Sequence, residues 1–182
     1  MLIKEKILDL KNGNQCTLRA PKEDDANELI ELLKLVCEQT PFLVSEPDEI
    51  NYTIDGEKAF IRKFNESLYD IMIIIEMNNI IIGNCSLMPA ANKRKEIHRC
   101  ELGIAILEEY WGLSIGRQVI EHAMKIAKAM GYEQIELDVV SGNTRAIALY
   151  TKLGFKEVGS IPCAIKLEDG TYYNDVKMIK RL

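Results

Sequence analysis

The sequence predicts a mixed α+β fold, in which about four helices flank a twisted, mostly antiparallel sheet of six or seven strands. Two apolar, β-branched runs, residues 71–76 and 80–87, are separated by three residues only, which is typical of a hairpin. Apolar residues recur at helical spacing over 115–130. A strand before that helix and another after it predict a β-α-β unit in the second half of the chain.

Composition limits the classes of protein that are possible. A chain of 182 residues with 47% apolar and 28% charged residues is expected to form one globular domain, residues 1–182. The net charge of -5 provides no basic field for a nucleic acid. Five cysteines without a C-x-x-C pair indicate reduced thiols rather than a disulfide framework.

Targeting and metal signals are absent from the sequence. The segment that starts at Met1 is charged and alternating, and no apolar run reaches 18 residues, so we expect a cytoplasmic protein without a membrane span. The two histidines, His98 and His122, stand in no metal-ligand spacing with a cysteine or with each other, so no metal site is expected.

The first 70 residues are predicted to form one strand and two helices. The strand covers 15–19, and an acidic segment beginning at Pro21 suits the start of a helix whose apolar face extends to Val36. Prolines interrupt regular structure over 40–55, a candidate substrate-side loop. A second, short helical pattern precedes the hairpin of strands 71–76 and 80–87.

The second half is predicted as strand, helix, strand, helix and two further strands. A strand covers 97–107, and the helix over 115–130 ends at a glycine cap. Another strand, 133–140, leads to Asn143, a residue type that caps the N-terminus of a helix. The last strands are expected at 155–159 and 172–179.

The run from Glu108 to Arg117 joins an apolar strand to an amphipathic helix through a glycine-containing turn. The first turn of a helix leaves backbone N–H groups unpaired, with the positive end of the helix dipole behind them. A phosphate can bind there without a cationic side chain, so the run is a candidate anion site.

Two segments, Trp111 to Gly116 and the Asn-x-x-Ala-x-x-Leu-Tyr-x-x-x-Gly-Phe pattern from Asn143 to Phe155, resemble the GNAT superfamily of acetyl-CoA-dependent N-acetyltransferases. The resemblance implies that the parallel strand pair is splayed. It also implies a cofactor-binding core at about 70–160 and acceptor-side helices at about 21–68. The first segment departs from the family pattern at Trp111, where Arg or Gln is usual, and at Ser114, where Gly is usual.

The same resemblance implies the cofactor contacts. Backbone N–H groups around the turn would hold the diphosphate, and the backbone near Ile106 would pair with the pantetheine amides and stabilise the developing oxyanion. Ser114 is read either as a helix N-cap or as a phosphate donor. The expected cofactor-binding residues are Ile106, Trp111, Gly112, Leu113, Ser114, Ile115, Gly116, Arg117, Asn143 and Tyr150.

Catalysis in this family needs an acid and a base. Tyr150 is the expected general acid, since a phenol with a pKa of about 10 stays protonated at neutral pH and can protonate a departing thiolate. Glu101 and Asp138 are the candidate general bases that would take the proton of the acceptor amine, and the choice between them stays open.

The implied function is an N-acetyltransferase that moves acetyl from acetyl-CoA to a primary amine of a small molecule, such as an amino acid or polyamine, by direct attack in a ternary complex. One alternative is acetylation of protein N-termini or lysines. Another is a non-catalytic acetyl-CoA-binding regulatory module. A homodimer through the last strands is possible because Tyr172, Val176, Met178 and Ile179 form an apolar pattern.

Overall fold

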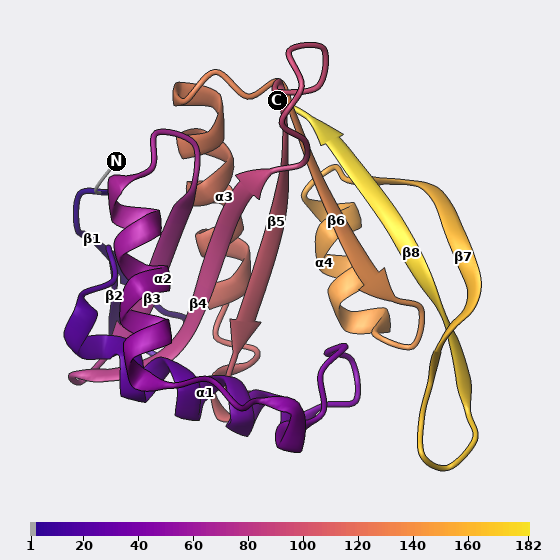
Figure 1. The fold of residues 1–182 in the computed structure, drawn as a ribbon, viewed down its shortest axis with the longest axis horizontal. Helices are drawn as coiled ribbons and strands as arrows, with labels where there is room; N and C mark the ends of the chain where they lie inside the picture. The colour runs from indigo at the N-terminus through magenta and orange to yellow at the C-terminus, as the bar shows by residue number, and fades with distance from the viewer. Residues whose placement is uncertain (1–2) are drawn as a thin grey trace.

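The computed structural model describes residues 3–182 and contains an eight-stranded sheet in the order β1-β2-β3-β4-β5-β6-β8-β7 (Figure 1). Residues 1 and 2, part of the N-terminal segment searched for a targeting signal, lie outside the described residues. The strands are β1 (Lys6–Asp9), β2 (Gln15–Arg19), β3 (Ile71–Met77), β4 (Ile80–Pro89), β5 (Arg99–Ile106), β6 (Gln134–Val140), β7 (Lys156–Lys166) and β8 (Tyr172–Arg181).

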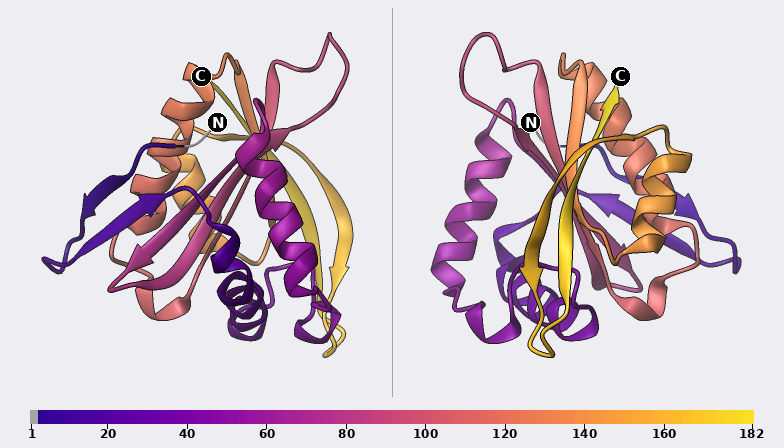
Figure 2. Two further views of the ribbon diagram at one scale, coloured as in Figure 1. Left: turned by 60° about the vertical axis from the view of Figure 1, so that its left-hand side comes forward. Right: turned by 90° about the vertical axis from the view of Figure 1, so that its right-hand side faces the viewer.

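Helices cover both faces of the sheet. The helices α1 (Ala26–Gln39) and α2 (Ile54–Glu66) lie on one face, and α3 (Ile115–Ala129) and α4 (Thr144–Lys152) lie on the other (Figure 2). The mixed α+β fold and the four helices agree with the sequence prediction. Within residues 3–182, no helix combines the length and apolarity that a bilayer crossing requires.

The sheet is antiparallel except between β5 and β6, which pair in parallel only from Arg99 to Glu101 against Gln134 to Glu136. Beyond these residues the two strands diverge into a V (Figure 1). A crossover through α3 connects them, as the β-α-β pattern predicts. The edge of β5 beyond Glu101 is therefore not covered by β6.

The predicted strand count of six or seven is too low by at least one. The charged, alternating start of the chain contains β1, which pairs with β2 from Lys6↔Leu18 to Asp9↔Gln15. Strand β7 also continues to Lys166, well beyond the expected end at residue 159, because it pairs with β8 across two register shifts. A strand with no buried residue carries no alternation that the sequence could reveal.

Two large hydrophobic clusters form most of the core, one on each face, and a third, small cluster contains Ile30, Cys37 and Ile50. The larger cluster packs α3 and α4 against the sheet, and the second large one packs α1 and α2 against β3 and β4. Val176 and Met178 belong to the larger cluster, so two of the four residues expected to form a dimer surface point into the core. Tyr172 is exposed.

A buried ion-pair network joins strands β2 and β3 to the start of α1. Arg19 on β2 donates to Asp25 at 2.7 Å and to Glu76 on β3 at 2.7 Å, and Arg19 and Asp25 are both buried. Removing one partner of such a buried pair typically costs about 3–5 kcal/mol. The network thus fixes helix α1 relative to the sheet.

The connection between α1 and α2 reaches across the open end of the V. The Phe42 and Tyr173 rings meet edge to face, with centroids 6.1 Å apart. A Cβ at Gly142, in the turn after β6, would lie 2.5 Å from the Tyr173 ring and 2.9 Å from Phe42. The absence of a side chain at residue 142 is what allows the α1–α2 connection, β8 and the β6 turn to meet.

Gly83 on β4 makes a similarly close approach to β5, and replacing it should destabilise the sheet. A Cβ there would lie 2.5 Å from the Ala105 carbonyl oxygen. We expect Gly83→Ala to lower the free energy of unfolding by about 1–3 kcal/mol in urea titrations. Gly159→Ala is the control, because a Cβ at residue 159 meets nothing within 4 Å. Equal stability of the two variants would contradict this account.

Candidate active site

The turn before α3 has the geometry of an anion site. Gly112 and Ser114 both have left-handed backbone, with φ of 83° and 68°. The first hydrogen bond of the helix runs from the Gln118 N–H to the Ser114 carbonyl. The N–H groups of residues 115–117 therefore precede the helical ladder, at the positive end of the helix dipole.

Of the two readings of Ser114, the N-cap position is found, but without the side-chain cap that usually accompanies it. Ser114 stands at the N-cap position, but its side chain makes no cap hydrogen bond. An N-cap residue normally has β-region backbone, which directs its hydroxyl at the next N–H groups, whereas Ser114 is left-handed. This conformation gives the physical reason why glycine is usual here in the resembling family.

The side chains of this turn point in different directions. Ile115 is buried in the core, and Leu113 packs against the same cluster. Arg117 is exposed and pairs with Glu121 at 2.9 Å. A Cβ added at Gly116 would lie at ordinary contact distance from the side chains of Leu149 and Ile106. Within residues 113–117, an anion would therefore be bound by backbone N–H groups and not by charged side chains.

Trp111 ties the turn to the end of β5. Its indole N–H donates to the Ile106 carbonyl at 2.7 Å, and the Arg145 guanidinium of α4 lies over its ring, 4.8 Å from the centroid. No pattern in the sequence indicates this tie. Because the Ile106 carbonyl is thereby occupied, the open edge for an added strand is the part of β5 from Leu102 to Ala105.

Tyr150 comes from α4 and lies in the larger core cluster, on the face that also contains Ile104 and Ile106. Its ring packs beside Phe155, with centroids 5.8 Å apart. The side chain is only 8% exposed, and this burial raises the pKa of Tyr150 to about 12. The phenol is thus protonated throughout the physiological range.

Asn143 caps α4, as its residue type predicts. Its side-chain oxygen accepts a hydrogen bond from the Ala146 N–H at 3.1 Å. The cap uses the oxygen and leaves the amide NH₂ group as a donor. Only the oxygen of the Asn143 side chain is therefore used in capping the helix.

The two candidate bases share a lysine that sequence reasoning misses. Lys177 on β8 lies 3.0 Å from Asp138 and 3.4 Å from Glu101, and also 3.7 Å from the buried Glu136. These contacts raise the pKa of Lys177 against the opposing effect of its burial. Both candidate carboxylates are thus brought together near the point where β5 and β6 begin to diverge, on the face of α1 and α2. A lysine opposite an aspartate across two strands is visible only once the β6–β8 register is known.

A cavity of about 630 Å³ lies on that same face, between α1, α2 and strands β3 to β5. Side chains alternate along β5, so Ala105, which lines the cavity, shares a face with Glu101. Tyr150 belongs to the opposite face. The sheet therefore has a buried phenol on one face of β5, and the cavity and the two candidate carboxylates on the other face.

The described residues fit an extended thioester cofactor. Free N–H groups at the start of α3 suit a diphosphate, and the adjoining open edge of β5 suits an amide-containing arm. Both features lie at the same end of β5, joined by the turn that Trp111 fixes. No group of three or more His, Cys, Asp or Glu arranged to hold a metal occurs among residues 3–182.

Comparison with known proteins agrees with this geometry. The sequence profile of the Acetyltransferase (GNAT) family matches residues 29–155. Two proteins named N-alpha-acetyltransferase are similar: that of Sulfurisphaera tokodaii is 29% identical over 82% of this chain and 86% of its own, and that of Saccharolobus solfataricus is 30% identical over 84% and 87%. A solved GNAT-family acetyltransferase of Streptococcus pneumoniae superposes with a TM-score of 0.86 at 28% identity, covering 92% of this chain and 99% of its own.

Ser114→Gly should stabilise the protein. A left-handed conformation costs a residue with a Cβ about 1–2 kcal/mol, and the greater flexibility of unfolded glycine offsets part of the gain. We expect a net increase of roughly 0.5–1 kcal/mol in the free energy of unfolding, measured by urea titration. Gly112→Ala, the matched change in the opposite direction, should lower it. A loss of stability in Ser114→Gly would show that the serine hydroxyl makes a stabilising contact.

Proposed function

The chain belongs to the acetyltransferase (GNAT) family and uses acetyl-CoA as its donor, and we propose that it transfers the acetyl group to a primary amine by direct attack in a ternary complex. The observation that carries this proposal is the V between β5 and β6, with Tyr150 on one face and an acceptor cavity on the other. Donor and acceptor can then approach each other from different directions.

The acceptor that we propose is an α-amino group. The names of the two similar N-alpha-acetyltransferases support this class over the wider class of small-molecule amines that the sequence favours. A small-molecule amine without an α-amino group, such as a polyamine, is the second candidate, and the cavity of about 630 Å³ is the observation in its favour.

The chain's own residues would hold the donor without basic side chains at the turn. The N–H groups at the start of α3 would bind the diphosphate, and the edge of β5 from Leu102 to Ala105 would pair with the pantetheine amides. Asn143 caps α4 through its side-chain oxygen, so its NH₂ group would serve as a further hydrogen-bond donor to the cofactor. Acetyl-CoA supplies the activated acetyl group.

Tyr150 would act as the general acid. Because burial raises its pKa to about 12, the phenol holds its proton at neutral pH. It can donate that proton in a hydrogen bond to the departing thiolate sulfur. An ordinary thiol such as that of free cysteine has a pKa of about 8.5, so complete transfer is uphill from the resting phenol. Glu101 or Asp138 would take the proton from the acceptor amine, on the opposite face of the sheet.

Direct attack is favoured over a covalent acetyl-enzyme. Cys85 and Cys100 lie near the V, and burial raises the pKa of both thiols to about 12. The thiolate is the nucleophilic form of cysteine, so neither thiol is activated. An acetyl group trapped on either cysteine during turnover would contradict this step.

The activity can be tested by CoA-thiol release from acetyl-CoA with α-amines of amino acids and short peptides, polyamines, and lysine side chains with a blocked α-amine. We expect release with one acceptor class above the background hydrolysis. Calorimetric binding of acetyl-CoA without release in any class would instead favour a regulatory binding module.

Tyr150→Phe should lower kcat about 10²–10⁴-fold, the usual contribution of a positioned acid. The Kd for acetyl-CoA should change little, because no charge and no cofactor-holding backbone is altered. With a pKa raised to about 12, the phenol keeps its proton throughout the neutral and mildly alkaline range, so the alkaline limb of the wild-type pH profile should not come from this residue. Unchanged kcat in the variant would remove Tyr150 from the mechanism.

Asp138→Asn and Glu101→Gln should separate the two candidate bases. The variant that lacks the base should lose about 10²-fold or more in kcat/KM and lose the acid limb of the pH profile. The other should lose less than about tenfold, since it removes only one of the contacts of Lys177. Near-wild-type kinetics in both variants would exclude both carboxylates as the base.

A further inference from the structure

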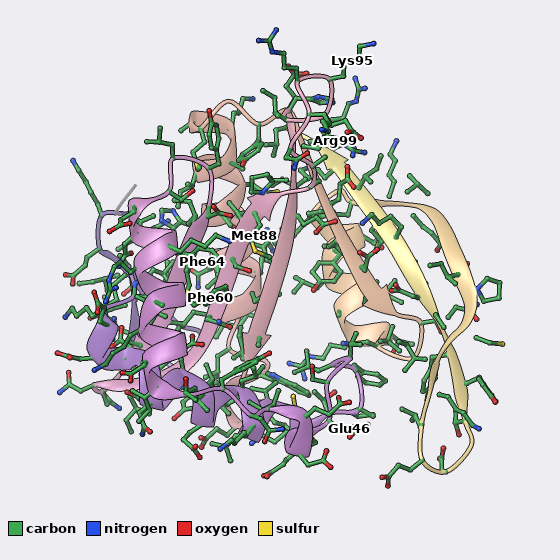
Figure 3. All side chains as sticks on the ribbon, in the orientation of Figure 1. Glu46, Phe60, Phe64, Met88, Lys95 and Arg99 are labelled. Carbon is green, nitrogen blue, oxygen red and sulfur yellow. The ribbon has the colours of Figure 1, made fainter. Side chains whose placement is uncertain are left out.

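The acceptor cavity has an uneven lining. Its walls are mostly apolar, with four residues of α1 and with Phe60 on α2, whose ring meets Phe64 edge to face at 4.9 Å (Figure 3). Its polar side chains come from the segment before α2, from Asn84 on β4 and from Glu57 on α2. Glu57 is the one carboxylate among the described residues that line it.

Glu57 has no partner of opposite charge. It makes no ion pair or side-chain hydrogen bond within residues 3–182, although the side chain is half-buried. Its pKa is raised by this burial alone. A carboxylate withdrawn from water beside apolar walls is costly unless a cation or donor joins it. The neighbouring Thr53, by contrast, is used as the helix cap of α2.

The cavity has a defined breadth. Its floor is made by Met72, Asn84 and Ala105, which lie on three adjacent strands, so it extends about 10 Å across the sheet. Ala105 is on β5, the strand beside the V where acetyl transfer is proposed. Glu57 is on α2, which packs over β3 at the other side. An acceptor that fills the cavity therefore reaches from the reaction centre to Glu57 across apolar surface.

We propose that this cavity selects acceptors with a second cationic group, which binds Glu57 and is separated from the reacting amine by an aliphatic stem of about five carbons. This inference rests on the proposed acetyltransferase function and narrows its acceptor. The shared chemistry is an α,ω-diamine skeleton, found both in a lysine residue that carries a free α-amine and in free diamines. The stem packs on the apolar walls, as lysine stems do on protein surfaces.

The surrounding charge and polarity agree with such an acceptor. Glu101, Glu136 and Asp138 lie on the same face around Lys177, and the chain carries a net charge of -5. This field favours a dication over a monocation. A polyhydroxylated amine such as an aminoglycoside would place hydroxyl groups against apolar walls without partners, which is unfavourable.

The test compares isosteric acceptors with and without the second charge. Lysine amide is paired with norleucine amide, and cadaverine with n-pentylamine, in CoA-thiol release assays on the full chain. In the wild type, kcat/KM for each charged acceptor should exceed that of its neutral partner by roughly tenfold to a hundredfold, which corresponds to one charge-assisted hydrogen bond. Comparison of kcat/KM for lysine amide with that for cadaverine then shows whether the acceptor is a lysine with a free α-amine or a free diamine.

Glu57→Gln should abolish that preference while leaving the Kd for acetyl-CoA unchanged. The effect should appear mainly in KM, because a binding contact to a distant group does not change in the transition state. Asp55→Asn is the control, since it removes an exposed carboxylate on the same helix outside the cavity. A wild type without preference, or a Glu57→Gln variant that keeps it, overturns the inference.

Calorimetric binding of the same amines in the presence of CoA separates this inference from the proposed function. A preference for the diamines that depends on Glu57, without any thiol release, would support the cavity's selectivity and refute the transferase activity. Turnover of neutral and charged amines at equal rates would support the activity and refute the selectivity.

Discussion

The divergence of β5 and β6 is the constraint on which the rest of this structure depends. Parallel pairing stops after Glu101 and Glu136, so the backbone of β5 beyond that point must find another partner or stay open. The helix α3 begins where β5 ends, and Trp111 fixes the turn between them by its hydrogen bond to Ile106. An open strand edge and the free N–H groups of a helix are therefore held together by one local connection.

The same divergence separates the two halves of the chemistry. Alternation along β5 sends Ile104 and Ile106 toward the face of Tyr150, and Glu101 and Ala105 toward the face of the cavity. A deeply buried phenol and an ion-paired set of carboxylates can then coexist within one small protein. The buried contacts of Arg19 hold α1 on the cavity face, so packing far from the V also shapes the cavity.

The sequence predicts this molecule best where local pattern and structure coincide. The helix over 115–130 and the Asn143 cap are confirmed, because apolar spacing and capping are local properties. Strand β1, the full length of β7, the backbone of Ser114 and the role of Lys177 were missed. Each depends on pairing or on a dihedral angle set by distant parts of the chain. The cavity and Glu57 belong to the same category, since residues from five elements line it.

Strand β7 has a consequence of a different kind. None of its residues is buried, yet it hydrogen-bonds to β8 along much of its length. Its backbone sustains the sheet while its side chains contribute nothing to the core. Mutations between Lys156 and Lys166 that preserve backbone pairing are thus nearly free of folding constraint. Over evolutionary time this edge is the part of the chain where new surface properties can arise without first being compensated elsewhere.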